Sequence, residues 1–320
     1  MTVSTPDSDV TVLITGANGF IGTHTAMHFE RHGIRIVPVD VLPRSNDLAL
    51  FTVKTPSHLF DIAEPGRLAD LCRKEKVTQI LHFAYPARKE ATQVLDFLLQ
   101  GTRNVLEVAR EVSMRRVVFS SSGAIYGPLR KGDGSRIRET DAVGIFPTFL
   151  YRSAKMLGEW LGDFYAVHHG VSFVALRLSG VYGPGLWRDI GEHLKQGIIG
   201  RECRPFLGRE PFDDPVYVED VARSMRLACF AEKPASRAYN IASGRPYSNE
   251  DLSRAIRKAL PDLAFEIGRD PDPVRHHRQR DMLDVNLAKN ELGFVPEYDL
   301  ESGIRATGEW LMSVRDKLGR

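Results

Sequence analysis

Residues 15–22 read TGANGFIG and place Gly16, Gly19 and Gly22 at regular spacing. A β-branched run, VTVLIT, precedes this loop, and a helical pattern follows it. In such a strand–loop–helix unit the first glycine permits a tight turn, the second lets backbone approach a pyrophosphate, and the third lets the helix pack closely. The helix N-terminus adds N–H groups that attract phosphate. A dinucleotide-binding loop is predicted, with a simple glycine-rich turn as the alternative.

An acidic residue at the end of the second predicted strand favours the first interpretation. Asp40 lies 18 residues beyond Gly22, close to the distance of about 20 expected of a ribose-binding acid. A carboxylate there accepts hydrogen bonds from ribose hydroxyls and repels a 2′-phosphate, so NAD is favoured over NADP. Arg44 argues the other way, because a nearby guanidinium accommodates a 2′-phosphate. Asp61 and Ile62 are predicted to flank the adenine, with a surface loop as an equal alternative.

The N-terminal half of the chain alternates short β-branched runs with helical patterns. Strands are predicted at 10–15, 34–40, 77–83, 115–120 and 172–178, and helices at 20–32, 65–74, 92–111 and 150–168. Alternation of this kind is typical of βαβ units. The predicted fold class is therefore α/β, with a Rossmann-like doubly wound parallel sheet.

The segments beyond Gly180 are shorter, and prolines punctuate them, which predicts a smaller C-terminal substrate-binding lobe. A strand-then-helix segment near residue 216 interrupts this pattern. We expect an NAD-binding Rossmann domain from 1–180 plus about 214–243. The lobe then comprises 181–213 plus 244–320, with a helix over 248–260 that Ser248 caps.

Charge and composition exclude several classes of protein. The 320 residues carry 43 basic and 41 acidic side chains, a net charge of +2, which gives no electrostatic case for nucleic acid or membrane binding. No apolar stretch approaches the roughly 18 residues of a membrane span, and the first ten residues are polar and lack the pattern of a signal peptide. The three cysteines are widely spaced and predict neither a metal site nor disulfides. We therefore expect a cytoplasmic protein without a metal.

A second motif carries chemistry. Tyr151 and Lys155 form Y-x-x-x-K near the start of a predicted helix, so that both side chains project from one face. A free phenol has a pKa of about 10, and a neighbouring ammonium favours the phenolate. Ser122 ends a predicted buried strand, where parallel sheets place residues that contact ligands. An amphipathic helix is the usual explanation of such a motif alone; its conjunction with the glycine loop, Asp40 and the serines favours catalysis.

Together these segments resemble the extended short-chain dehydrogenase/reductase family, also called the NAD-dependent epimerase/dehydratase family. The matching segments are TGANGFIG (15–22), Asp40, HFA (82–84), FSSSGAIYG (119–127), YRSAK (151–155), LRLSGVYGPG (176–185), VYVEDVA (216–222), YNIASG (239–244) and LGFVPEYDLESGI (292–304). The resemblance covers nearly the whole chain in order. It is specific for the family and says little about the substrate.

The resemblance implies NAD in the first lobe and substrate in the cleft beneath the second. Ser122, Tyr151 and Lys155 match the family's catalytic triad. The implied cofactor contacts are Gly16, Asn18, Gly19, Phe20, Ile21, Gly22, Asp40, Asp61, Ile62, Phe83, Ala84, Tyr151 and Lys155. The family also implies a homodimer through the helices at 92–111 and 150–168.

The departures from the family pattern narrow the chemistry. Gly123 and Ala124 follow Ser122 where 4,6-dehydratases carry an Asp-Glu pair, and Ala124 stands where certain epimerases use a cysteine. Gly180 replaces an Asn, and Asp213 replaces an Arg, that contact the nucleotide-sugar in UDP-sugar 4-epimerases. Leu98 replaces the Asn of a helix motif. We expect the carboxylate of Asp213, which Asp214 follows in the sequence, to repel a nucleotide diphosphate.

The leading hypothesis is an NAD-dependent oxidoreductase acting on a hydroxyl or carbonyl carbon of a small polyhydroxylated or hydroxy-acid substrate. A nucleotide-sugar 4-epimerase that retains its NAD uses the same residues and is the first alternative. An NAD-sensing, non-catalytic binding protein is the second. The candidate substrate contacts, in addition to Ser122 and Ala124, are the cations Arg88, Lys89 and Arg188 and the basic run RHHRQR (275–280), each with solvated surface as its alternative.

Overall fold

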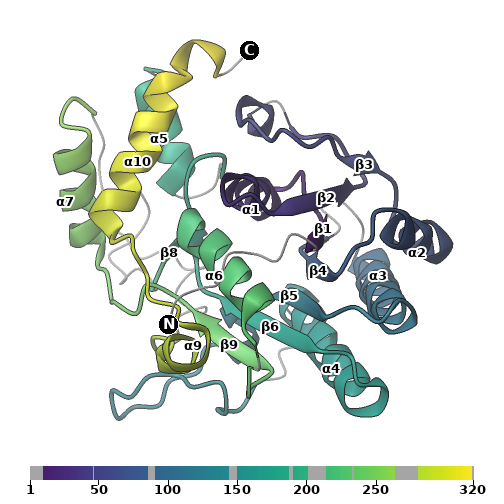
Figure 1. Cartoon of the computed structure of the whole chain (residues 1–320). Coiled ribbons are helices and arrows are strands. Elements are labelled where there is room, and N and C mark those ends of the chain that lie inside the picture. The colour runs from purple at the N-terminus through teal and green to yellow at the C-terminus, as the bar shows by residue number, and fades with distance from the viewer. Residues whose placement is uncertain are drawn as a thin grey trace.

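A parallel sheet of seven strands, in the order β3-β2-β1-β4-β5-β6-β9, forms the centre of the computed structural model (Figure 1). The structure describes residues 10–45, 47–85, 91–143, 150–186, 190–200, 214–232, 234–263 and 280–318. The strands are β1 (Thr11–Thr15), β2 (Arg35–Asp40), β3 (His58–Leu59), β4 (Gln79–His82), β5 (Arg116–Ser122), β6 (Phe173–Leu178) and β9 (Ala238–Ile241). A separate parallel pair joins β7 (Val181–Tyr182) to β8 (Val216–Tyr217).

Helices cover both faces of the sheet. The α-helices of the described residues, on the sheet and beside it, are α1 (Phe20–Arg31), α2 (Pro65–Lys74), α3 (Ala91–Glu111), α4 (Leu150–His169), α5 (Ile190–Ile198), α6 (Val218–Phe230), α7 (Asn249–Ala259), α9 (Asn286–Leu292) and α10 (Leu300–Ser313). In β1, Val12 and Ile14 face one core with α1, α6 and α9, while Leu13 faces a second core with α2, α3 and α4. This arrangement confirms the predicted Rossmann-like α/β fold.

The remaining helices α5, α7 and α10 group beside the sheet and share a core of their own (Figure 1). The predicted cap of α7 is present as a reciprocal capping box between Ser248 and Asp251. Helix α9 instead packs on the sheet through Ala288 and Leu292. The chain thus returns to the sheet after it has entered the second group of helices.

One predicted boundary is wrong in a way that concerns the site. The predicted range 115–120 stops two residues short of Ser122, the residue expected at the strand end. Strand β5 reaches Ser122, because Ser121 and Ser122 pair in parallel with Arg177 and Leu178 of β6. The sequence pattern stops earlier because serines lack the β-branched signature of a strand. The consequence is that Ser122 is fixed by backbone pairing.

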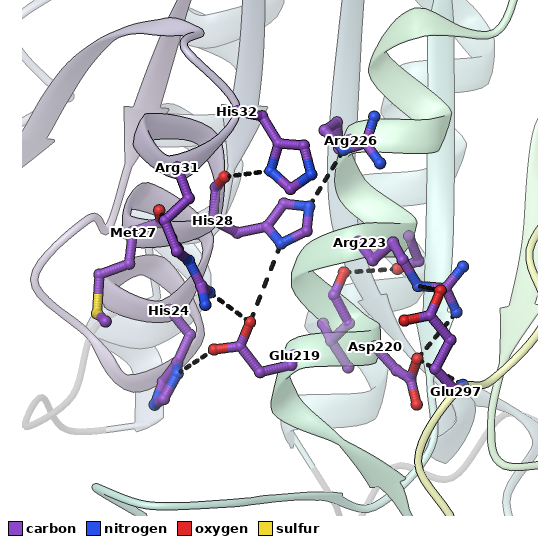
Figure 2. A network of polar contacts seen from close by, with 12 residues as sticks. His24, Met27, His28, Arg31, His32, Glu219, Asp220, Arg223, Arg226 and Glu297 are labelled. Carbon is purple, nitrogen blue, oxygen red and sulfur yellow. Dashed lines mark hydrogen bonds and ion pairs between the residues drawn. The ribbon is translucent and has the colours of Figure 1, made fainter. Parts of the chain in front are cut away.

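A polar network joins α1 to α6 (Figure 2). The Glu219 carboxylate on α6 forms an ion pair with Nη2 of Arg31 at 2.5 Å and lies 3.4 Å from Nδ1 of His24. One turn further along α1, Nε2 of His28 accepts a 3.1 Å hydrogen bond from Arg226. Because α1 begins at the glycine loop, this network anchors the helix that presents the loop.

Burial, together with the charges of His32 and Arg226, lowers the pKa of His28 to about 3. The unfolded chain therefore binds a proton near pH 6.5 that the folded protein does not bind. Stability present above pH 6.5 is lost as the pH falls from 6.5 toward 3, with a limiting slope of about 1.4 kcal/mol per pH unit for one histidine. We expect His28→Gln to flatten this decline, measured by urea unfolding at several pH values.

The matched control for this experiment is His58→Gln, because His58 is exposed on the short strand β3. Burial and Lys155 also lower the pKa of His82 to about 3. Its contribution to the pH dependence of stability is therefore the same in every variant. Equal slopes for His28→Gln and the unsubstituted protein would contradict the assignment.

Candidate active site

The glycine loop is shaped so that side chains are excluded from it. Gly16 has φ of +69°, and a Cβ there would lie 2.7 Å from the backbone nitrogen of Ala84. A Cβ on Gly22 would lie 2.2 Å from the carbonyl oxygen of Gly16. Gly19 is the N-cap of α1. Because glycine has no side chain that could cap the helix, the first N–H groups of α1 remain available to a ligand in the loop. This cradle fits the diphosphate of a dinucleotide.

Asp40 lies at the end of β2, beside the loop. Its carboxylate accepts hydrogen bonds from the backbone N–H groups of Asn18 (2.9 Å), Val41 (2.7 Å) and Leu42 (3.2 Å). Arg44 reaches the same place, because its Nε donates to Oδ1 of Asn18 at 3.3 Å. Carboxylate and guanidinium thus both stand near the position expected for the ribose 2′-oxygen.

We expect NAD to bind more tightly than NADP, by about tenfold, because the carboxylate of Asp40 repels a 2′-phosphate more than Arg44 attracts it. Calorimetric dissociation constants for both nucleotides measure this preference. Arg44→Ala is expected to increase the ratio of the NADP and NAD dissociation constants, and Asp40→Ser is expected to decrease it. Tighter binding of NADP to the unsubstituted protein would make Arg44 the dominant partner.

Of the other predicted cofactor residues, Phe83 and Ala84 border the same loop. Phe83 donates its N–H to the carbonyl of Thr15 at 3.1 Å, which brings the next residue, Ala84, against Gly16. Asp61 Oδ1 accepts the N–H of Ala63 in a local turn. The Ile62 side chain is buried in the core with α2 and α3, so a contact of Ile62 to a ligand must come from its backbone.

The predicted catalytic residues come from β5 and α4. Ser122 ends β5, and its Oγ accepts the N–H of Ala124 at 3.1 Å. Tyr151 and Lys155 lie one turn apart on α4, and the Lys155 Nζ is 5.8 Å from the centre of the Tyr151 ring. Lys155 donates a 2.6 Å hydrogen bond to the carbonyl of Ser120. The lysine is thereby held against the strand that presents Ser122.

Burial lowers the pKa of Lys155 to about 8, and the negative charge of Glu159 opposes this shift. Glu159 lies one turn further along α4. Its carboxylate accepts hydrogen bonds from both Nε and Nη2 of Arg177 at distances of 2.8–3.1 Å. Ser121 also hydrogen-bonds to Glu159, and Arg177 donates to the Tyr126 hydroxyl at 2.7 Å. This network beneath the Y-x-x-x-K motif was absent from the sequence prediction. Its signal was the i, i+4 spacing of Lys155 and Glu159.

One acid on the substrate side of the site has a charged partner. Asp214 is buried and accepts hydrogen bonds from Ser179 (2.5 Å), Arg280 (2.9 Å) and the N–H of Leu283 (2.7 Å). Arg280 balances the charge of Asp214, so the predicted repulsion of a diphosphate depends on Asp213, which lies outside the described residues.

Arg88, Lys89, Arg188, Asp213 and residues 275–279 lie outside the described residues. Ala124 is partly exposed beside Ser122. Gly180 is exposed, and a Cβ there would meet nothing within 4 Å.

Among the described residues, none of the His, Cys, Asp and Glu side chains form a group of three or more that suits a metal ion.

Three features define the class of Rossmann-type dinucleotide-dependent oxidoreductases. They are a phosphate cradle at a helix N-terminus, an acid at the end of the second strand, and a tyrosine–lysine pair bonded to a strand that ends in a serine. Residues 12–242 match the NAD dependent epimerase/dehydratase family. The chain belongs to this family of enzymes, and its cofactor is NAD. The family assignment from sequence is thereby confirmed.

Relatives and solved structures agree with this assignment. UDP-glucuronate 4-epimerase 4 of Arabidopsis thaliana is 26% identical over 96% of this chain and 76% of its own length. UDP-glucose 4-epimerase of Thermus thermophilus in complex with NAD is 25% identical, with a TM-score of 0.77 over 94% of this chain and 98% of that one. The Brucella ovis UDP-glucose 4-epimerase with NAD is also 25% identical, with a TM-score of 0.80 over 95% and 98%. Within the described ranges, no helix has the length and apolarity that a membrane crossing requires.

Proposed function

We propose that the protein transfers a hydride between NAD and a hydroxyl or carbonyl carbon of a small polyhydroxylated or hydroxy-acid substrate. The observation that carries this proposal is the placement of Tyr151 and Lys155 on α4, with Lys155 bonded to the strand end that presents Ser122. NAD, when bound, supplies the hydride acceptor or donor. The phenol of Tyr151 moves the hydroxyl proton, and Ser122 Oγ orients the substrate oxygen. Lys155 stabilises the phenolate and binds the cofactor ribose.

The substrate class rests on what has replaced the nucleotide-sugar contacts. Gly180 leaves open space where a polar side chain is expected in UDP-sugar epimerases, and the sequence has Asp213 in place of an arginine. A diphosphate needs cations or helix N-termini to bind it. Thermal-shift and turnover screens with NAD present, comparing sugar acids and hydroxy acids with nucleotide-sugars, test this. Strong stabilisation and turnover by a nucleotide-sugar would overturn the small-substrate assignment.

The second candidate is a nucleotide-sugar 4-epimerase. It is favoured by the names of the relatives and by the ion pair of Asp214 with Arg280, which leaves Asp214 no unbalanced charge to repel a diphosphate. Such an enzyme returns the hydride to the opposite face of the same molecule and has no need to release NAD. Native mass spectrometry of the purified protein distinguishes the two. Retained NAD favours the epimerase, and an empty protein favours the dehydrogenase.

We also propose the division of the chain into a Rossmann domain, 1–180 plus about 214–243, and a substrate-binding lobe, 181–213 plus 244–320. It is supported by the place of β9 in the sheet and by the separate core of α5, α7 and α10. A cytoplasmic location is proposed as well. The buried free thiols of Cys72 and Cys229 agree with a reducing compartment.

We propose a homodimer through α3 and α4, which pack against each other. Leu99 on α3 and Trp160, Phe164 and Val167 on α4 are 41–63% exposed, an unusual density of large apolar side chains on one surface. Light scattering at micromolar concentration is expected to give twice the chain mass of 35.9 kDa. Trp160→Glu is expected to give the monomer, and Met312→Glu, at an exposed position on α10, to leave the dimer intact. A monomer before any substitution would contradict the proposal.

A further inference from the structure

Three aromatic rings surround the ammonium group of Lys155. Its Nζ lies 5.0 Å from the ring centre of Phe119 on β5, 5.7 Å from that of Tyr85 and 5.8 Å from that of Tyr151. A cation within about 6 Å of an aromatic face is attracted by the ring's quadrupole. The rings therefore favour the charged form of a lysine whose pKa is lowered by burial.

Tyr85 is a member of this enclosure that sequence analysis did not single out and that lies on neither β5 nor α4. It follows HFA at the end of β4 and is 36% exposed. Its ring stands edge-on to that of Tyr151, with centres 5.2 Å apart and planes at 67°. Aromatic pairs attract one another in this T-shaped geometry. Tyr85 thus contacts both functional members of the Y-x-x-x-K motif from a different element of the fold.

We propose that Tyr85 is a positioning residue, whose ring fixes the ring of Tyr151 and keeps the Lys155 ammonium beside the phenol. The proposal rests on the proposed function, because the phenol needs a fixed orientation only if it transfers the substrate proton. The neighbouring titratable groups have other partners. Glu159 on α4 binds Arg177, and His82 on β4 hydrogen-bonds to Thr15 and Thr102.

The coupled titration of the phenol and the ammonium reports on their distance. The two groups lose their protons in two steps, and the steps separate further as phenolate and ammonium attract more strongly. Both steps are visible in the NMR signal of Tyr151 in protein made with isotope-labelled tyrosine and no added nucleotide. Tyr151→Phe assigns that signal by removing it.

Three substitutions at Tyr85 distinguish the effect of the aromatic quadrupole from the effect of side-chain volume. Tyr85→Phe keeps the aromatic face and removes the Tyr85 phenol, whose pKa is raised by burial and by Tyr151. The separation of the two steps, which is the quantity compared, is therefore expected to match that of the unsubstituted protein. Tyr85→Leu keeps apolar bulk without the quadrupole, and Tyr85→Ala removes both. In these two variants we expect the steps to move closer by about one pH unit, a tenfold change in the ratio of ionisation constants. Met312→Ala, which shortens an exposed side chain on α10, is the control.

Turnover on the substrate found by the screen adds a second measurement. We expect kcat to fall about tenfold in Tyr85→Leu and to recover in Tyr85→Phe, with the melting temperature unchanged. Steps that stay in place in both Tyr85→Leu and Tyr85→Ala would overturn the role of Tyr85 and leave the proposed function standing. Full turnover by Tyr151→Phe would overturn the proposed function, whatever the titration shows.

Discussion

Tyr151→Phe is expected to bind NAD with unchanged affinity and to lose turnover by about 10²–10⁴-fold, the usual contribution of a positioned general acid–base group. The substitution removes one oxygen and keeps the ring, so the contacts of that ring with Tyr85 and Lys155 survive. Calorimetry with NAD and steady-state kinetics measure the two quantities separately.

Two further variants bracket this result. Lys155→Ala is expected to weaken NAD binding as well as turnover, because the lysine serves both the phenol and the ribose. Tyr298→Phe removes a phenol hydroxyl from the segment between α9 and α10, outside the proposed catalytic residues, and is expected to leave both quantities unchanged. Near-normal turnover by Tyr151→Phe on the true substrate would refute the role of the phenol.

Arg177→Met is expected to lower the free energy of unfolding by about 3–5 kcal/mol, because it leaves the carboxylate of Glu159 buried with the Ser121 hydroxyl but without its ion-pair partner. The side chains of this pair are only 9% and 8% exposed. The double variant Arg177→Met with Glu159→Leu is expected to recover much of the loss, since it removes both charges from the interior. Denaturant unfolding monitored by circular dichroism measures each value.

The matched control is Arg35→Met. Arg35 pairs with Glu75 at 2.6 Å, but its side chain is 57% exposed. Exposed pairs of this kind contribute about 0–1 kcal/mol. Equal losses for the two arginine variants would show that burial of the Glu159–Arg177 pair has no special weight.

The elements with strong local signals were predictable from sequence. The helix at Pro65–Lys74 and the start of α4 at Leu150 agree with the expected bounds, because apolar side chains recur there at helical spacing. The glycine loop was predictable as well, since its spacing reflects backbone contacts that a Cβ would obstruct.

Features that depend on long-range contacts were missed. The two-residue strand β3 at His58–Leu59 exists only through pairing with β2 and has no periodicity of its own. The partner of Asp214 is Arg280, which lies far along the chain in the basic run for which a ligand contact was considered. Composition alone cannot say whether a charge faces a substrate or another side chain, because the answer depends on the packing of distant segments.

The late return of α9 to the sheet has a consequence for synthesis on the ribosome. Ala288, Leu292 and Phe294 complete the core that β1 and α1 begin. At roughly 5–20 residues per second, the nascent chain spends seconds with that apolar surface uncovered after β9 has emerged. During this interval the surface is a site for chaperone binding, and a chain stalled before residue 286 is expected to remain a client for chaperones and proteases.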